Sequence, residues 1–373
     1  MKLLVVSHSS VVGAYQGKLR ELARRDDLDV HLVIPHAWIE NNRLVSAQIP
    51  SEAPYKVHVV RAFRLGYVAS FFYNPMHFSR IVRNFCPDVV YAEEEPWSVA
   101  AWQSMRAAKS IGARFVFFTW ENVWRKYKWI SERILIRVLS GASAAVVGGA
   151  EAESILRRRG FNRPLIKLPQ YGIDPTVFEH DRENRRPRPS ETIIAYFGRL
   201  EREKGVDLLL HAMTALDQQC SLLVVGEGKE KQSLIATARE LGLDQRVRFP
   251  DGIPHEKVPE LLQTVDIVVL PSITTTEWKE QFGRILVEAM ASGIPVVGSD
   301  SGTIPEVVGD AGMVFPEGDA NALTACLQRL VRSPESAATL GRKGQARAMT
   351  NYTNAHVAEE LHRFFRMLTA ESN

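Results

Sequence analysis

The sequence predicts an α/β fold with two doubly wound, Rossmann-like domains. Short runs rich in β-branched residues alternate along the chain with segments of helical periodicity. Such alternation gives parallel strands that are covered by helices on both faces of a sheet. The runs also fall into two sets, separated by the charged, proline-containing segment 180–190. A chain of 373 residues is long enough to form two hydrophobic cores.

The expected strands can be placed in order along the chain. The first domain, 1–170, should contain strands at 2–7, 29–35, 55–62, 87–93, 113–119 and 142–149. The second domain, 171–355, should contain strands at 191–198, 220–228, 246–252, 266–272 and 295–300. Segment 353–370 has apolar residues at helical spacing. Ligands of such domains bind beyond the carboxyl ends of the strands, so functional residues are expected in the loops that follow strands.

The composition excludes several classes of protein. A formal net charge of +3 gives no reason to expect a nucleic-acid partner. Cys86, Cys220 and Cys326 lack the spacing of a metal site, and we expect them to be the reduced thiols of a cytoplasmic protein. We expect no signal peptide, because the apolar run in the first residues is short, and we expect no transmembrane helix, because no apolar run approaches the length needed.

Segment 280–300, EQFGRILVEAMASGIPVVGSD, gives the strongest functional signal. The pattern predicts a loop, then a helix from about Gly283 to Ser292, with Gly293 as its C-terminal stop, and then a strand. The first backbone N–H groups of such a helix have no intrahelical partner, and together with the helix dipole they favour an anion. Gly283 has no side chain that would keep a phosphate away from this end.

Two glutamates frame this helix. Glu288 lies about 7 Å along the axis from the helix start, at ~1.5 Å per residue, which suits a ribose attached to a diphosphate. A carboxylate can accept two hydroxyl hydrogens, so Glu288 could hold that ribose. Glu280 precedes the helix and could reach a sugar on the other side of the phosphates. The alternative is a surface helix with solvated glutamates, which the apolar neighbours of Glu288 disfavour.

A second loop, YFGRLEREKG at 196–205, presents Arg199 and Lys204 after an expected strand. Two cations in a short loop suit a diphosphate, with arginine as a planar fork and lysine as a point charge. An ordinary basic surface loop would have the same composition. The glycine-rich turn in VVGEG, at 224–228, also follows a strand but is weak by itself, because it is not a GxGxxG motif.

These motifs together resemble glycosyltransferase family 4, the retaining nucleotide-sugar transferases with the GT-B fold. The family pattern is a glutamate, seven residues and a second glutamate, with Phe-Gly soon after the first. Here these residues are Glu280, Phe282, Gly283 and Glu288, and the similarity continues through Asp319. The resemblance covers the C-terminal half. It implies two Rossmann-like domains that face a central cleft, with a C-terminal helix, about 356–373, on the first domain.

The resemblance also implies roles for individual residues. Glu288 would bind the nucleotide ribose and Glu280 the donor sugar, while Arg199 and Lys204 would bind the diphosphate. We take Glu280, Arg199 and Lys204 as the catalytic residues. Ile253 would contact the base through its backbone, and the amides of 282–285 would meet the diphosphate and sugar. The further donor-binding residues implied are Gly13, Gly198, Gly226, Glu227, Ile253, Phe282, Gly283, Arg284 and Ile285.

The loop after the first strand departs from the family pattern. The family usually has adjacent glycines there, and only Gly13 carries over. Tyr15, Gln16 and Lys18 follow it. These three side chains are candidates for contact with the acceptor, or they simply begin a helix.

A second departure lies after the strand at 113–119. Many family members have a histidine there that contacts the donor sugar, whereas this chain has Trp120-Glu121-Asn122. Glu121 and Asn122 could hydrogen-bond a sugar, or they could cap the next helix. His8 and His36 follow other strands, and we expect structural roles for both.

Segment 122–140 combines aromatic and basic residues. Its cations are Arg125, Lys126, Lys128, Arg133 and Arg137. A basic amphipathic helix with tryptophan can lie on an anionic membrane surface. The alternative is a helix that packs its apolar side on the first domain, with its cations lining the acceptor cleft.

We therefore expect a retaining glycosyltransferase that moves a sugar from a nucleoside diphosphate sugar to a hydroxyl of a sugar, lipid-linked or small-molecule acceptor. Its setting would be glycan, glycolipid or glycoconjugate synthesis in the cytoplasm, with or without peripheral contact to the inner membrane face. No cofactor and no metal are expected, because Arg199, Lys204 and the helix start would stabilise the departing diphosphate. A Rossmann-type oxidoreductase is disfavoured by the missing GxGxxG after the first strand. A catalytically silent nucleotide-sugar-binding module stays open until turnover is measured.

Overall fold

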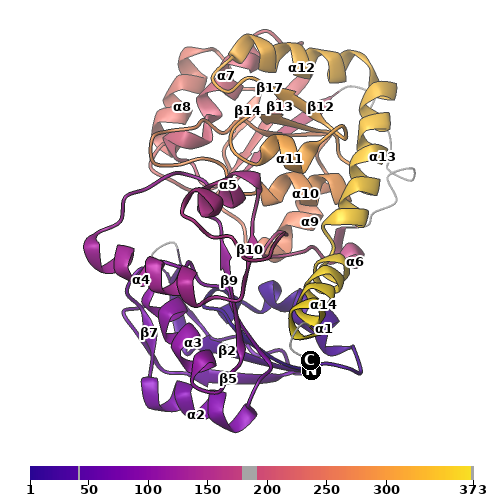
Figure 1. Cartoon of the computed structure of the whole chain (residues 1–373). Helices are drawn as coiled ribbons and strands as arrows, with labels where there is room; N and C mark the ends of the chain where they lie inside the picture. The colour runs from indigo at the N-terminus through magenta and orange to yellow at the C-terminus, as the bar shows by residue number, and fades with distance from the viewer. Residues whose placement is uncertain (41–42, 179–190, 371–373) are drawn as a thin grey trace. The chain divides into compact units, whose positions relative to one another are not determined.

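A computed structural model describes residues 1–40, 43–178 and 191–370 of the chain. The predicted connection at 180–190 lies outside the described residues. The chain divides into two compact units (Figure 1). The first unit comprises Met1–Gly172 with Asn354–Asn373, and the second comprises Ile173–Thr353. These boundaries lie close to those expected, after residues 170 and 355.

The first unit is built on a seven-stranded parallel sheet with the order β11-β10-β9-β8-β1-β2-β5. The predicted strands of this domain are confirmed, and β11, which has only three residues, is an addition. The strands are β1 (Lys2–Val6), β2 (Asp29–Pro35), β5 (Lys56–Val60), β8 (Val89–Ala92), β9 (Arg114–Thr119), β10 (Ala144–Val147) and β11 (Leu165–Lys167). Central strands such as β8 and β10 are buried along their whole length, as expected for a sheet covered on both faces.

Helices cover both faces of this sheet. Leu19 packs with Leu361 and Phe365 on one face, and Phe78 packs with Phe115 on the other. The helices are α1 (Gly17–Ala23), α2 (Pro75–Phe85), α3 (Val99–Lys109), α4 (Trp129–Gly141), α5 (Ala150–Arg158) and α14 (Asn354–Ala370). Two small antiparallel ribbons, β3 (Ala37–Glu40) with β4 (Arg43–Ser46) and β6 (Ala62–Phe63) with β7 (Phe72–Tyr73), complete the unit.

The second unit is built on a six-stranded parallel sheet with the order β14-β13-β12-β15-β16-β17. Here too the predicted strands are confirmed, and the three-residue strand β17 is an addition. The strands are β12 (Thr192–Phe197), β13 (Cys220–Val225), β14 (Val247–Arg248), β15 (Ile267–Leu270), β16 (Val296–Ser299) and β17 (Met313–Phe315). The register pairs Phe197 with Val225 and Leu270 with Gly298, so the carboxyl ends of the four central strands lie along one edge.

The helices of the second unit flank its sheet. They are α6 (Pro175–Phe178), α7 (Val206–Thr214), α8 (Lys231–Glu240), α9 (Val258–Leu262), α10 (Arg284–Ala291), α11 (Ile304–Val308), α12 (Ala320–Arg332) and α13 (Pro334–Asn351). The loops that follow β12, β13, β15 and β16 meet at the carboxyl edge, and they contain 198–205, 226–230, 271–283 and 300–303. The predicted class of two doubly wound parallel sheets is confirmed.

Candidate functional site

The start of α10 is set by a glycine in a left-handed conformation. Gly283 has φ 69° and ψ 50°, which an L-residue adopts only with strain. A Cβ at this position would also lie 2.9 Å from Leu270 Cδ2. At the other end, the N–H of Gly293 donates to Met290 O (2.8 Å) and that of Ile294 to Ala289 O (2.9 Å). This pair of bonds is a Schellman motif, so the predicted limits of the helix are confirmed.

Glu288 is buried on α10, with 2 % of its surface exposed. Its Oε1 accepts a hydrogen bond from Arg284 Nε at 2.7 Å. Arg284 Nη2 lies 2.8 Å from His255 Nε2. Burial lowers the pKa of His255, although the Glu288 carboxylate opposes this, so we assign a neutral ring whose Nε2 accepts from Arg284. Glu288 is therefore a buried carboxylate with a charged partner, and not a solvated glutamate on a helix surface.

Glu280 is held in place by two donors to the same oxygen. Its Oε2 accepts from Lys204 Nζ at 2.6 Å and from Ser272 Oγ at 2.7 Å. The side chains of Glu280 and Lys204 are 9 % and 11 % exposed, so this ion pair is shielded from water. The ammonium group of Lys204 also lies 4.4 Å from the ring centroid of Trp278, which is cation–π geometry. Two residues predicted as catalytic are thus in direct contact.

Arg199 differs from Lys204 in its surroundings. It is exposed, and its guanidinium has no ion-pair partner among the residues that the structure describes. Its backbone is fixed, because the Tyr196 hydroxyl donates to Arg199 O at 2.7 Å. The side chain therefore stands in solvent on a rigid loop.

Glycines allow the loops after β12 and β13 to pack backbone against backbone. The N–H of Gly198 donates to Val225 O (3.0 Å), and that of Leu200 donates to Glu227 O (2.8 Å). A Cβ on Gly226 would overlap the carbonyl oxygen of Gly198. The predicted positions Gly198 and Gly226 are therefore neighbours, and a side chain at Gly226 would force these loops apart.

The remaining predicted donor residues of the second unit lie on the same edge. Glu227 Oε1 accepts from Lys231 Nζ (2.9 Å) and from the N–H of Gly252 (3.1 Å). Ile253 packs, partly buried, against the core of the second unit. Phe282 and Ile285 also pack against this core.

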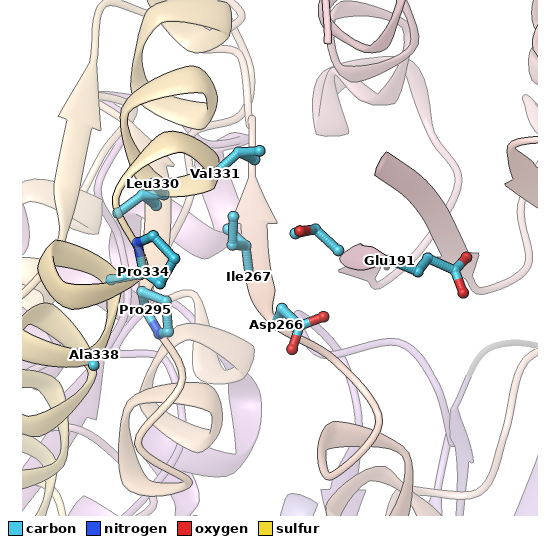
Figure 2. Close-up of a pocket in the computed structure, with 10 residues that line it drawn as sticks. Glu191, Asp266, Ile267, Pro295, Leu330, Val331, Pro334 and Ala338 are labelled. Carbon is cyan, nitrogen blue, oxygen red and sulfur yellow. The ribbon is translucent and has the colours of Figure 1, made fainter. Parts of the chain in front are cut away.

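A pocket in the second unit lies at the other edge of the sheet (Figure 2). Asp266 and Ile267 at the start of β15, and Pro295 just before β16, line it together with Leu330 and Pro334. The parallel strands begin here and end at the edge that carries Glu280 and the Gly283 turn. This pocket therefore does not coincide with the predicted donor site.

Gly13 and Tyr15 lie in a short 3₁₀ helix, Gly13–Gln16, directly before α1. The N–H of Gly13 donates to Gln48 Oε1 at 2.7 Å. The ring of Tyr15 stacks on that of Tyr171, with 4.7 Å between the centroids. Both residues are partly exposed, so they stay available for the predicted contacts.

Gln16 is fully buried, and its amide is satisfied inside the first unit. Its Nε2 donates to Ser10 O (2.7 Å) and Gln48 O (2.9 Å), and its Oε1 accepts from the hydroxyl of Tyr55 (2.7 Å). These bonds fix the polypeptide around the first strand. The predicted acceptor contact does not fit this burial, and we assign Gln16 a structural role.

Lys18 is also buried, at 1 % exposed. It forms an ion pair with Glu93 and donates a hydrogen bond to Gln170 O. Burial lowers the pKa of Lys18, and the Glu93 carboxylate raises it. A cation removed from solvent in this way holds α1 against the end of β8, so the predicted acceptor role does not fit Lys18 either.

The three consecutive glutamates that directly follow β8, Glu93 to Glu95, were not among the predicted site residues. Glu94 Oε2 lies 2.6 Å from His8 Nδ1, and Glu94 Oε1 accepts from the backbone N–H of His8 at 2.8 Å. Glu95 accepts from Thr119 Oγ1 (2.6 Å) and from the N–H of Trp120 (2.9 Å), and burial raises its pKa to about 7. The sequence signal that could have identified them is a run of acidic residues directly after a buried strand. Acidic side chains at such a position are not expected to be solvated.

The residues at the family histidine position are both buried. Glu121 and Asn122 are each 8 % exposed. Glu121 Oε1 accepts from Arg159 Nη2 at 2.7 Å. Neither residue caps the next helix, because α4 begins at Trp129 and its N-cap residue is Lys128. The capping alternative is therefore wrong.

Segment 122–140 is not one helix. Residues 120–128 form an irregular loop, here called the basic loop, and only α4 is helical. Arg159 contacts several residues of this loop. Its guanidinium lies 4.5 Å from the centroid of the Trp124 ring and 5.3 Å from that of the Tyr127 ring. It also donates a hydrogen bond to Arg125 O at 2.8 Å. Cation–π and ion-pair contacts thus replace helical hydrogen bonds there.

The described part of the chain holds no group of three or more histidine, cysteine, aspartate or glutamate side chains placed to bind a metal ion. An Asp-x-Asp sequence does occur at Asp27-Leu28-Asp29. It lies at the amino end of β2, and Asp27 Oδ2 pairs with His362 Nε2 at 2.9 Å. It is therefore remote from the carboxyl edge of its sheet. Within the described residues, no helix is both long and apolar enough to cross a membrane.

Comparison with known proteins finds relatives among glycosyltransferases. The chain is 32 % identical over 220 residues to an MMP α-(1→4)-mannosyltransferase of Mycolicibacterium hassiacum, covering 57 % of this chain and 51 % of that protein. It is 31 % identical over 196 residues to a GDP-mannose-dependent α-(1-6)-phosphatidylinositol monomannoside mannosyltransferase of Mycolicibacterium smegmatis, covering 51 % of each. The chain thus spans about half the length of the curated relatives it matches.

Solved structures match the whole chain. Sucrose-phosphate synthase from Thermosynechococcus elongatus has a TM-score of 0.76 at 21 % identity and covers 100 % of both chains. Anabaena HepE, in a complex with UDP, has a TM-score of 0.76 at 20 % identity and covers 98 % of this chain and all of that one. These likenesses show the GT-B fold. Residues 177–347 match the family described as glycosyl transferases group 1, and this region contains Arg199, Lys204, Glu280 and Glu288.

Proposed function

We propose that this protein is a retaining glycosyltransferase of family 4, which moves a sugar from a nucleoside diphosphate sugar to an acceptor hydroxyl. The observation that carries the proposal is the pair of buried carboxylates around the start of α10. Glu288, with Arg284, lies on the helix, and Glu280, with Lys204, lies before it. Both stand within the region that matches the glycosyl transferases group 1 family.

The donor would lie across the start of α10. The diphosphate would meet the backbone N–H groups at the start of α10, together with Arg199 and Lys204. Glu288 would accept the two ribose hydroxyls on one side, in exchange for part of its bond with Arg284. Glu280 would accept hydroxyls of the donor sugar on the other side.

Catalysis would come mainly from stabilising the leaving diphosphate. Its negative charge grows as the glycosidic bond breaks, so a cation fixed beside it is more valuable in the transition state than with bound donor. The acceptor hydroxyl would attack from the face that the diphosphate leaves, with its proton passing to a phosphate oxygen, which retains the anomeric configuration. Because Arg199 and Lys204 already supply positive charge, we propose that no metal ion is needed.

The comparisons bear on the nucleotide of the donor. One relative's name specifies GDP-mannose, and one structural neighbour was solved with UDP. We propose a sugar or lipid-linked acceptor, bound by the partly exposed Tyr15 and neighbouring loops after β1. The free cysteines Cys86, Cys220 and Cys326 suit the reducing cytoplasm.

We also propose that α4 and the basic loop contact an anionic membrane surface. Trp129, Ile130 and Ile136 are 68 %, 54 % and 59 % exposed. Arg133 and Arg137 are exposed on the same helix, and Arg125, Lys126 and Lys128 are exposed in the basic loop. Aromatic and aliphatic side chains beside several cations suit the interface of an anionic bilayer.

The test of the transferase proposal begins with a thermal-shift panel of UDP, GDP, ADP and their sugar conjugates. A ligand at 100 times its Kd should add about 2.7 kcal/mol of stability and raise Tm visibly. The best donor is then incubated with chelator-treated protein, and release of sugar from the nucleotide is followed. Turnover without added Mg²⁺ or Mn²⁺, and a product with the donor's anomeric configuration, are expected. Binding without turnover would identify a silent module, and activity that needs a divalent ion would contradict the metal-independent mechanism.

A further inference from the structure

Ser272 directly joins the end of β15 to Glu280. The residue follows Pro271, has none of its surface exposed, and donates from Oγ to Glu280 Oε2 at 2.7 Å. The two residues are eight positions apart, so this bond closes the loop between them across its base. Lys204 donates to the same carboxylate oxygen at 2.6 Å.

The backbone of this serine is itself anchored. The hydroxyl of Ser299, at the end of β16, donates to Ser272 O at 2.5 Å, and Ser299 is also completely buried. Ser272 is therefore fixed to two adjacent strands of the sheet. It has little freedom to follow a ligand, whereas Lys204 has a long flexible side chain.

The backbone of Glu280 is held from the opposite direction. The N–H of Thr303 donates to Glu280 O at 3.2 Å, and the Thr303 hydroxyl donates to Gln281 O at 2.7 Å. A Cβ on Gly302, where φ is +55°, would overlap the Glu280 carbonyl. The peptide and the carboxylate of Glu280 are thus held by separate contacts, and Ser272 provides an uncharged one.

Lys204 has two roles in the proposed function, and they compete. It pairs with Glu280 in the structure, and it would turn toward the diphosphate when donor binds. A carboxylate that relied on Lys204 alone would lose its position at that moment. We propose that Ser272 is a positioning residue that keeps the Glu280 carboxylate directed at the donor sugar while Lys204 engages the diphosphate.

This inference rests on the proposed function, and it predicts a specific pattern of kinetic loss. Ser272→Ala should lower kcat/KM for the nucleotide sugar about tenfold, the usual effect of losing a hydrogen bond to a charged group. Affinity for the nucleoside diphosphate without its sugar should change less than twofold, because Glu280 would not contact that part. Ser272→Thr, which keeps the hydroxyl, should recover most of the activity.

A double-mutant cycle with Glu280→Ala tests whether Ser272 acts through Glu280. In the Glu280→Ala background, Ser272→Ala should have no further effect on kcat/KM. Ser292→Ala is the matched control, because Ser292 is a buried serine of the same unit whose Oγ has no hydrogen-bond partner among the described residues. This control should keep wild-type kinetics.

The outcomes separate this inference from the proposed function. If the wild-type protein turns over no nucleotide sugar, the function fails before Ser272 is tested. If the wild type is active and Ser272→Ala is equally active, or the two substitutions have additive effects, the positioning role is wrong. Should Ser272→Ala fail to fold, Ser272→Cys preserves the volume with a much weaker donor, and undiminished kcat/KM in that variant would overturn the inference.

Discussion

Arg199→Ala isolates the electrostatic contribution to catalysis more cleanly than any substitution of Lys204. Arg199 is exposed and makes no ion pair among the described residues, so its removal should change the free energy of unfolding by less than ~0.5 kcal/mol. Lys204 is different, because it forms a buried ion pair with the Glu280 carboxylate. Breaking a buried ion pair costs roughly 3–5 kcal/mol, and that loss of stability would obscure the catalytic effect.

The expected catalytic loss for Arg199→Ala follows from its surroundings. Removing one preorganised group that stabilises transition-state charge costs about 3–4 kcal/mol. Arg199 should fall at the lower end of this range, because its side chain is exposed to solvent. A loss of about 3 kcal/mol corresponds to roughly 10² in kcat.

The assay is single-turnover release of sugar from the donor, together with a denaturant unfolding curve of each variant. Single-turnover conditions exclude product release as the limiting step. Lower kcat with unchanged unfolding free energy is the expected result. An Arg199→Ala variant with wild-type single-turnover rate would refute the assignment of this guanidinium to the departing diphosphate. Arg202→Ala is a suitable control, since it changes a cation on the same loop that is not assigned to the site.

Three further predictions concern separate parts of the molecule. Glu288→Ala should raise the donor KM more than it lowers kcat, because ribose contacts are the same in ground and transition states; normal donor KM in a folded variant would contradict ribose binding. Replacing Arg125, Lys126 and Lys128 together by glutamine should release the protein from anionic vesicles in co-sedimentation, since each cation contributes about 1 kcal/mol near such a surface; unchanged binding, or none by the parent, would remove the membrane proposal. Burial raises the pKa of Glu95 to about 7, so its contribution to stability is present below about pH 4.5 and is lost as the pH rises through 7. The unfolding free energy of the wild type should therefore fall over this interval relative to that of Glu95→Gln. If the two proteins have parallel pH profiles, Glu95 is solvated.

The parts of the site that could be predicted from sequence are those fixed by local geometry. The limits of α10 follow from Gly283, which needs a left-handed conformation, and from Gly293, which ends the helix. The burial of Glu288 follows from the apolar residues that flank it on both sides in the helix. Both inferences need only residues within about two turns of one another, where periodicity is informative.

The contacts that sequence could not supply join distant residues. Lys204 and Glu280 are 76 positions apart, and Arg159 reaches Glu121 across 38. Arg159 also explains why the helix predicted over 122–140 is wrong for its first residues. Its contacts with Trp124 and Tyr127 fix these residues as a loop. Strands β11 and β17 were missed because three residues are too few to show a pattern.

The charges of the donor site explain why buried glutamates are tolerated in an otherwise apolar region. Lys204 balances Glu280, and Arg284 balances Glu288, so neither carboxylate carries the full cost of an isolated buried charge. Arg199 is then the cation whose charge is not offset by a carboxylate among these described residues. In the proposed function, donor binding would therefore exchange partners within these two ion pairs. An uncharged anchor such as Ser272 is what allows one pair to open while its carboxylate keeps its place.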